Sequence, residues 1–544
     1  MLLLPRPAGV APDSSLRVHM TGAPNESALS IASVLALWCL VWVAAALLVH
    51  PVPPDDSIEQ LVWAQGLEWG YYKHPPLPTW ITWLTLHTFG GGLGMTAVLA
   101  YVVLAIGFAF FWLFVRDLAG RGVATTTVVL SLCVYHFGGR GYVLNHNTFS
   151  VALGYASAWA ALRALRPLAG VDYGRWSVLG LIAGLSLLAK YQSLLTLAAI
   201  AVAAWQAERL WATRFRADVL RGLTLAALVA AAVVMPHVVW LIENGFAPLH
   251  YAEHSVLGHA MSLGDRAERI VHFVAMEVRD CGAALAAFGL IAWLRRRRRA
   301  KAVPSFQVLA ISPSASTWAM VLAIGPFAFV ASLCLLFGVF LHGHWVTTVF
   351  EFSALPVALW LHRGNRQTNS RLLIQGAILA QAMMLVWFVW IFSSQRGVML
   401  GAHRSGGFEP SELEEVIEDV WEETSSTSVP YVVAPQWLGG LAAYALPERP
   451  QVVIDGDFQK TPWVDQGRVE QCGAVYLGSA ARQAIGPDIT RGVLRVPAER
   501  PEHATHALDF AIVPPRGECP PLRAPPGTLR AWIGTHLKNF RQSV

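Results

Sequence analysis

The chain is poor in charged residues, and this shortage excludes most classes of water-soluble protein. Only 14% of its 544 residues are charged, while 55% are hydrophobic; a soluble domain carries about 25% charged residues. Its six cysteines include no CxxC pair and no Cys/His cluster, so no structural zinc site is predicted. Residues 1–29 lack the apolar core of about 7–15 residues that defines a cleavable signal peptide. We therefore expect them to form an N-terminal tail.

Long apolar runs follow one another between residues 30 and 392. About 20 apolar residues suffice to cross a bilayer as a helix. The run 176–207 exceeds one crossing and is interrupted at Lys190-Tyr191, which predicts two shorter helices. About eleven transmembrane helices are thus predicted, over 30–50, 94–115, 123–139, 142–162, 176–189, 192–207, 222–242, 280–294, 317–341, 346–361 and 372–392.

Arginine is concentrated in alternate loops, which predicts the orientation. Loops rich in Lys and Arg stay in the cytoplasm, so the N-terminus is expected there, and everything after residue 392 is expected outside. The run 295–299 is better explained as a topology anchor than as a nucleic-acid site. The arginines of the predicted cytoplasmic loops are Arg116, Arg121, Arg163, Arg166, Arg175, Arg209, Arg214, Arg216, Arg221, Arg295 to Arg299, Arg363, Arg366 and Arg371.

Residues 393–544 differ in character from the rest, with more Pro, Gly and charge and no further spanning run. Helical periodicity with a capping-box start predicts a helix over 411–422. Short strands over 431–434 and 452–455, with a helix over 436–445 between them, predict a small external α/β domain of βαβ type. Its only cysteines are Cys472 and Cys519, and an oxidising compartment would favour a disulfide between them.

The first external loop, 51–93, is too long for a simple connection and too apolar for a solvated one. The spacing of Ile58, Leu61 and their neighbours predicts a helix on the membrane surface, and residues 77–89 predict a second such helix. Before the first helix stand Asp55 and Asp56. Asp56 could be the N-cap of this helix, because Glu59 follows three residues later as in a capping box. It could equally be a functional acid, and the two roles do not exclude each other.

The sequence of this loop resembles the first-loop signature of the bacterial GT-C glycosyltransferases, which include protein O-mannosyltransferases and lipid A aminoarabinose transferases. It is most similar to the rhizobial-type galacturonosyltransferases. The resemblance covers nearly all of 30–365 and implies an all-α polytopic membrane module over 30–392, followed by the external domain. The motifs that carry it are Asp56-x-x-Glu59-Gln60, Tyr71-Tyr72-Lys73-His74-Pro75-Pro76, Asn145-His146-Asn147, Ala189-Lys190-Tyr191, Pro236-His237, Asn244-Gly245 and His344-Trp345.

Such enzymes pass a sugar from a polyprenyl-phosphate carrier to an acceptor at the outer face of the membrane. The resemblance therefore implies an inverting glycosyltransferase of a bacterial inner membrane with a periplasmic C-terminal domain. Its partners would be a polyprenyl-phosphate-sugar donor, membrane lipids, and an acceptor that is lipid A, lipopolysaccharide core, another glycan or a protein. The alternative is a transporter or lipid flippase, which the interruption at Lys190 would also suit. Against it, the chain shows no inverted repeat and few acids within helices.

The resemblance also implies roles for individual residues. Asp56 matches the acid assigned as general base, which takes a proton from the acceptor hydroxyl; Asp55 is the alternative if the alignment slips by one. Lys190 is the first candidate for the donor phosphate, because an ionisable residue between apolar half-helices is a functional hypothesis by default. Its alternative is to extend along the helix toward the interface.

Other candidates follow from the same motifs. His74, Lys73 and Arg140 are further donor-phosphate candidates. Asn145 and Asn147 could bind sugar hydroxyls or simply cap a helix, and His344 could be an interfacial polar residue. Aminoarabinose-type enzymes have a Glu followed by a Lys where this chain has Lys73 and His74, and an acid where this chain has asparagine at the start of the run 142–162. These differences weigh against a divalent metal, and no cofactor is firmly predicted. The substrate-binding candidates are Glu59, Tyr71, Tyr72, Asn145, Asn147, Tyr191 and His344.

Overall fold

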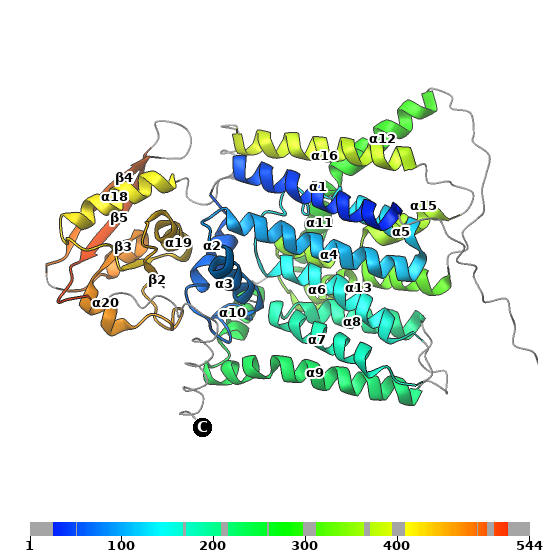
Figure 1. The fold of residues 1–544 in the computed structure, drawn as a ribbon, viewed down its shortest axis with the longest axis horizontal. Helices are drawn as coiled ribbons and strands as arrows, with labels where there is room; N and C mark the ends of the chain where they lie inside the picture. The colour runs from blue at the N-terminus through cyan, green and yellow to red at the C-terminus, as the bar shows by residue number, and fades with distance from the viewer. Residues whose placement is uncertain are drawn as a thin grey trace, which may run out of the picture.

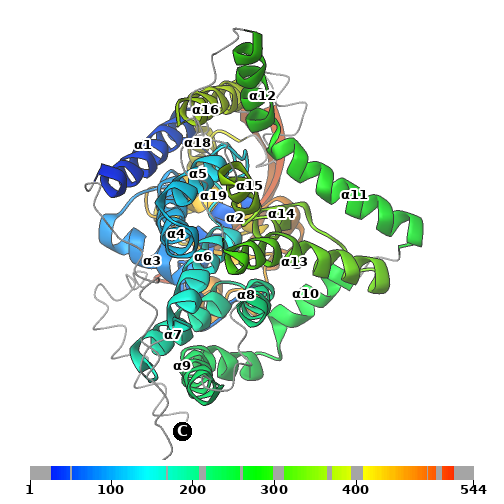
Figure 2. The ribbon, with the colours of Figure 1, turned by 90° about the vertical axis from the view of Figure 1, so that its right-hand side faces the viewer.

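The computed structural model consists of a bundle of long helices with a five-stranded sheet domain at one end (Figure 1). Seen along the bundle axis, α11 (Leu263–Asp280) lies across the view, whereas the long helices point toward the viewer (Figure 2). The structure describes residues 26–49, 52–166, 170–207, 216–257, 261–297, 312–363, 370–393, 408–486, 488–497 and 505–519.

Every predicted apolar run overlaps a helix, but two runs differ from their helices. In the run 123–139 the helix ends at Leu132, and the run 346–361 is divided into α14 (Val346–Val349) and α15 (Ala354–His362). Five of the described helices are long and apolar enough to cross a membrane, namely α1, α4, α9, α13 and α16, and α7, α8 and α12 are shorter apolar helices. The number of crossings stays a prediction. The bounds are α1 (Glu26–Val49), α4 (Met95–Ala119), α5 (Arg121–Leu132), α6 (His146–Ala164), α7 (Tyr173–Ala189), α8 (Ser193–Ala207), α9 (Arg216–Glu243), α12 (Gly282–Arg297), α13 (Pro313–Phe337) and α16 (Ser370–Ser393).

Helix α6 is the centre of the bundle and is buried along most of its length. It meets α4 closely at Gly107, where a Cβ would lie 2.8 Å from Ala152 Cα. Small residues allow such approaches between membrane helices. Farther along, the rings of Phe111 and Tyr155 stack with centroids 4.1 Å apart, and the Tyr155 hydroxyl donates to the backbone oxygen of Glu351 over 2.8 Å. These contacts connect α4 and α6 to the turn between α14 and α15.

Short helices gather between the bundle and the sheet domain. They are α2 (Asp55–Trp63), α3 (Leu77–Phe89), α10 (Ala247–Leu257) and η2 (Gly343–Trp345). The second loop helix has the bounds predicted from the sequence. The first does not lie on the membrane with its apolar face, because Ile58, Leu61 and Val62 are fully buried and the cluster around Ile58 and Val62 belongs to the core of the sheet domain. A protein core satisfies the same apolar pattern as a bilayer surface, so the pattern alone could not distinguish them.

The sheet domain contains the predicted βαβ unit, in which β1 (Tyr431–Ala434) and β2 (Gln451–Ile454) are parallel and α19 (Gln436–Ala445) connects them. The strand order is β2-β1-β3-β5-β4, with β3 parallel to β1 and β5 antiparallel to both of its neighbours. The remaining elements are α18 (Pro410–Glu422), α20 (Gln466–Cys472), β3 (Ala474–Leu477), η3 (Gly478–Gln483), β4 (Thr490–Pro497) and β5 (Thr505–Val513).

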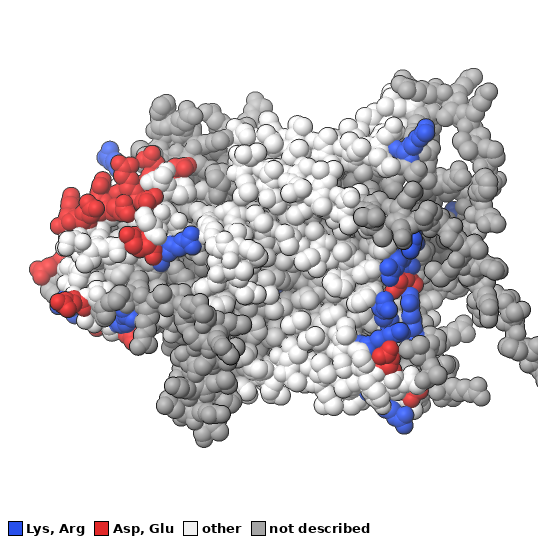
Figure 3. All heavy atoms as spheres, viewed as in Figure 1, with Lys and Arg blue, Asp and Glu red and all other residues white. Residues whose placement is uncertain are grey.

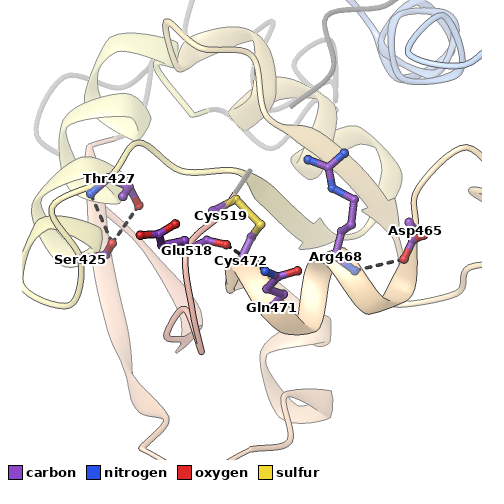
Figure 4. Close-up of a disulfide and its surroundings, with 8 residues drawn as sticks. All are labelled: Ser425, Thr427, Asp465, Arg468, Gln471, Cys472, Glu518 and Cys519. Atoms are coloured by element: carbon purple, nitrogen blue, oxygen red, sulfur yellow. Dashed lines mark hydrogen bonds between the residues drawn. A yellow bond between two sulfur atoms is a disulfide. The ribbon is translucent and has the colours of Figure 1, made fainter. Parts of the chain in front are cut away.

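Two details of this domain concern predictions made from the sequence. Helix α18 begins at Pro410 with Glu409 in the cap position, so the capping box expected at Ser411 is wrong; proline is favoured in a first helical turn. Cys472 and Cys519 form a disulfide that ties the end of α20 to the segment after β5 (Figure 4).

Charge is distributed unequally between the two ends of the molecule. Lys and Arg gather at the end of the bundle opposite the sheet domain, and acidic residues gather on the sheet domain (Figure 3). At the basic end, Arg116 and Arg166 lie 2.8 and 3.4 Å from the carboxylate of Asp117. The predicted tail 1–29, except its last four residues, lies outside the described residues, as do Arg209, Arg214, Arg298, Arg299 and Arg366.

Candidate functional site

Most of the predicted site residues line a cavity of about 230 Å³ where the bundle faces the sheet domain, called here the basic cavity. Arg140, Tyr71 and Tyr72 are not among its lining residues. Its walls come from the first loop, the start of α6, the break between α7 and α8, helix α10 and the segment around η2. The side chains that bring charge or hydrogen bonds to it are Asp56, Glu59, Lys73, His74, Asn145, His146, Asn147, Lys190, Tyr191, Gln192, Tyr251, Ser255, His342 and His344.

Asp56 lies in the first turn of α2, which starts at Asp55 with Pro54 as its N-cap residue. Asp56 is therefore not the N-cap, and the purely capping interpretation is wrong. Its Oδ2 atom accepts a hydrogen bond from Asn145 Nδ2 over 2.9 Å. Asn145 in turn caps α6, because its Oδ1 accepts from the backbone N–H groups of Asn147 and Thr148. The capping role predicted for Asn145 is therefore confirmed, and the same side chain also holds Asp56.

Lys190 separates α7 from α8, because its backbone is extended at φ −163° and ψ 137°. Its side chain is buried, and Nζ donates to Asn147 Oδ1 over 2.5 Å. Asn147 Nδ2 donates to the backbone oxygen of His344 over 3.2 Å. Among the described residues no carboxylate oxygen lies within 4.0 Å of Lys190 Nζ. The Lys190 ammonium can therefore form an ion pair with an anionic ligand in the basic cavity.

Lys73 is already paired, since its Nζ lies 2.5 Å from Glu59 Oε2. Burial would lower the pKa of Lys73, but the neighbouring Glu59 carboxylate and Tyr72 raise it well above its usual range. The side chain is consequently a charged partner of Glu59. Its role as a second phosphate ligand, predicted from the motif, has to compete with that ion pair.

His74 and His146 face each other with ring centroids 4.1 Å apart. Burial lowers the pKa of His74 well below its ordinary value, and the neighbouring His146, Lys190, Lys73 and His344 lower it further. His74 is therefore a neutral imidazole at neutral pH. It can exchange hydrogen bonds with a phosphate or a sugar, but it brings no positive charge.

A second cavity of about 810 Å³ lies on the other side of Asp56 and is called here the large cavity. Its charged lining residues are Asp55, Asp56, Arg140, Arg279 and Asp280, and α16 supplies much of its apolar lining. Arg279 lies 2.8 Å and Arg140 4.0 Å from the carboxylate of Asp280. Asp56 lines both cavities.

The structure separates some residues that the motifs had grouped. Arg140 lines the large cavity, whereas Lys190, Lys73 and His74 line the basic cavity. Tyr71 and Tyr72 line neither; Tyr71 donates to the Gly66 oxygen over 2.7 Å and Tyr72 donates to Gln436 over 2.9 Å.

Two other predicted substrate-binding residues do reach the basic cavity. Tyr191 lines it, with its hydroxyl 2.8 Å from His237 Nε2, and His344 lines it beside Asn147.

Several residues of the two cavities escaped the sequence analysis. Arg279 and Asp280 stand at the start of the run 280–294, and a charged pair at that position was the available signal. His136 lines neither cavity but is buried beside them, with Nδ1 3.6 Å from Asp280 and 3.7 Å from Glu277. It gave no signal because it lies in an apolar run. Among the described residues no group of three or more His, Cys, Asp or Glu side chains is arranged to hold a metal ion.

Comparison with known proteins places this geometry in context. Residues 73–240 match the family model described as dolichyl-phosphate-mannose-protein mannosyltransferase. Two lipopolysaccharide core galacturonosyltransferases of Rhizobium johnstonii are similar: RgtA, 28% identical over 38% of this chain and 41% of its own length, and RgtB, 25% identical over 50% of this chain and 53% of its own length. The chain thus aligns with about half the length of these curated relatives.

Solved structures share the fold over almost the whole chain. ArnT from Cupriavidus metallidurans, bound to undecaprenyl phosphate, superposes with a TM-score of 0.60 at 14% identity and covers 90% of this chain and 98% of ArnT. Its apo form gives a TM-score of 0.58 at 12% identity. Together with the apolar helices and the family match over residues 73–240, these likenesses show an integral membrane protein that has the fold of ArnT and is similar to the glycosyltransferases of the GT-C type.

Proposed function

We propose that this chain is an inverting glycosyltransferase that takes a sugar from a polyprenyl-phosphate carrier and passes it to an envelope acceptor. The observation that carries the proposal is the position of Asp56, which lines both the basic cavity and the large cavity. A base between two substrate chambers can remove a proton from one substrate as it attacks the other. The proposed place of the reaction is the outer face of the bacterial inner membrane, because the arginine-rich end of the bundle lies opposite the sheet domain (Figure 3).

The donor phosphate is assigned to the basic cavity. Lys190 supplies a buried ammonium without a carboxylate partner within 4.0 Å among the described residues, and Asn147 orients it. A fixed donor set that meets the charge of the leaving phosphate lowers the barrier to its departure. The ArnT structure that shares this fold holds undecaprenyl phosphate, which supports a polyprenyl phosphate as the carrier here.

The acceptor is assigned to the large cavity. Its hydroxyl oxygen attacks the anomeric carbon of the donor sugar and forms the new glycosidic bond. The bond from that carbon to the phosphate oxygen breaks, and the phosphate leaves with the electron pair. The acceptor proton passes to the carboxylate of Asp56, which Asn145 holds at the junction. Attack from the side opposite the phosphate inverts the anomeric configuration.

The sugar and acceptor are proposed by analogy with the curated relatives. Both are named as lipopolysaccharide core galacturonosyltransferases, so polyprenyl-phosphate galacturonic acid is the first donor to test, with a core oligosaccharide or lipid A as acceptor. Lys190, in the cavity assigned to the donor, would favour such an acidic sugar electrostatically.

Mass spectrometry of lipid A, core oligosaccharide and other envelope glycans from a deletion strain tests the proposal. We expect one sugar to be missing, and to return with the wild-type gene but not with Asp56→Asn. A transporter or flippase, which the break at Lys190 would also suit, needs no general base. Full restoration by a well-expressed Asp56→Asn protein would therefore contradict transfer catalysed at Asp56.

A further inference from the structure

Helix α2 has two faces with different partners. Asp56 and Glu59 face the basic cavity, while Ile58 and Val62 are fully buried toward α19 of the sheet domain. The approach is closest at Gly440, where a Cβ would collide with Ile58 Cγ2 and lie 2.7 Å from Val62 Cγ2. The helix that carries the proposed base is thus part of the hydrophobic core of a domain whose chain begins more than 340 residues later.

The residues that follow α2 are attached to the sheet itself. Gln65 Nε2 donates to the Pro450 oxygen over 3.0 Å, and Gln65 Oε1 accepts from the Val452 N–H over 2.9 Å. β2 is an edge strand of the sheet. The Gln65 side chain forms with it the two hydrogen bonds that the backbone of a neighbouring strand would form. They fix how far α2 stands from the sheet and in which direction it points.

A second attachment reaches the opposite side of the first loop. Gln436, the first residue of α19, accepts hydrogen bonds at Oε1 from the Tyr72 hydroxyl over 2.9 Å and from Lys73 Nζ over 3.3 Å. Lys73 in turn holds Glu59 over 2.5 Å. Glu59 and Asp56 are three residues apart on α2 and therefore share a helix face.

We propose that the sheet domain positions the catalytic helix, with Gln65 and Gln436 as positioning residues that set the place of Asp56 relative to Lys190. The inference rests on the proposed function, because it assumes that Asp56 takes part in transfer. Neither glutamine lines the basic or the large cavity, so neither contacts the substrates placed there. A displacement of a reacting group by about 1 Å can cost about 100-fold in rate, so loosening either attachment should slow the chemical step.

The test uses full-length protein in detergent and two variants, Gln65→Leu and Gln436→Leu, which keep the side-chain size but remove the hydrogen bonds. The matched control is Gln466→Leu, a glutamine of α20 in the same domain whose side chain bonds only to the exposed Glu470. We expect kcat to fall at least tenfold in both variants, with the KM for the donor and the affinity for undecaprenyl phosphate within twofold of wild type. Amide hydrogen exchange over 57–63 should quicken while exchange over β1 and β3 does not change.

A merely structural role predicts a different pattern. It would lower the melting temperature and the amount of folded protein, leaving kcat per folded molecule and the exchange of α2 unchanged, and that outcome would overturn the inference. If a leucine variant fails to fold, Gln65→Asn and Gln436→Asn replace it, since they stay polar but are one methylene too short for both bonds. Failure of the proposed function is distinguishable, because it would appear as full transfer by Asp56→Asn whatever the glutamine variants do.

Discussion

Asn145 Nδ2 lies 2.9 Å from Asp56 Oδ2, so the residue that caps α6 also holds the acid at the start of α2. The contact joins the loop that carries α2 to the centre of the bundle, 89 residues later in the chain. It also leaves the other oxygen of Asp56 for a proton from a substrate.

Asp56→Asn is expected to give a folded and inactive protein. The amide cannot accept a proton at neutral pH, and general bases typically contribute about 10²–10⁴-fold in rate. Transfer is measured with purified protein and a polyprenyl-phosphate sugar, and folding by the melting temperature. Asp55→Asn is the control, because Asp55 also lines the large cavity but does not line the basic cavity. A comparable loss in the control alone would shift the base to Asp55.

Lys190→Ala is expected to weaken binding of undecaprenyl phosphate severely. Truncating one partner of a buried charge pair costs about 2–5 kcal/mol, and Lys190→Arg should recover part of the loss because it keeps the charge in another shape. Affinity is measured by competition with a labelled polyprenyl phosphate. Unchanged affinity in a folded Lys190→Ala protein would assign the side chain to interfacial anchoring instead.

Because His74 is buried as a neutral imidazole, the protein should be less stable in mild acid than at neutral pH. Its pKa is lowered well below 6.5 in the folded state, first by burial and then by neighbouring charges, whereas the unfolded chain titrates near its ordinary value of about 6.5. Below that pH the unfolded state binds more protons, so stability falls as the pH decreases. The melting temperature of wild type should drop more between pH 7.5 and 5.5 than that of His74→Gln. Equal drops would show that His74 is not buried as a neutral imidazole.

The orientation can be tested with reporter fusions. Because the arginine-rich end is assigned to the cytoplasm, a reporter fused after Phe392 should lie outside and one fused after Arg299 should lie inside. Alkaline phosphatase and green fluorescent protein give opposite readouts for the two compartments. A cytoplasmic reporter after Phe392 would contradict the eleven-helix topology.

The disulfide determines how many cysteine thiols can react before and after reduction. Cys39, Cys133, Cys281 and Cys334 are free and Cys472 is bonded to Cys519, so denatured protein should bind four maleimides without reductant and six after reduction. Linking residues 47 positions apart stabilises a fold by about 4 kcal/mol in the chain-entropy model. Cys472→Ser should therefore lower the melting temperature of the sheet domain. Six reactive thiols before reduction would contradict the bond.

The helices of the bundle were predictable because bilayer thickness imposes a length on apolar runs. Each run has its helix, and the interruption at Lys190 follows from one charged residue within an apolar stretch. The βαβ unit of the sheet domain was predictable for a similar reason, since its short buried strands flank a helix of ordinary length.

The surroundings of the site were harder to predict from the sequence. Ile58 and Val62 have an amphipathic pattern that fits a membrane surface as well as a protein core, and their partner Gly440 is remote in sequence. Gln436 and Gln65 are ordinary polar residues in their local context, and only the tertiary structure shows what they hold. Arg279 and Asp280 reach the large cavity through α11, a helix that the apolar pattern did not reveal.

The attachment of Gln65 to β2 has a consequence for the sheet domain as an isolated fragment. An unpaired strand at the end of a sheet is a template for aggregation, and here the Val452 N–H and the Pro450 oxygen are occupied by a side chain from the membrane module. Cutting the chain before α18 would uncover both of these groups, together with the apolar surface of α19 that covers Ile58 and Val62. The first loop therefore covers a strand edge and an apolar face of the sheet domain, and the domain should aggregate when it is expressed without that loop.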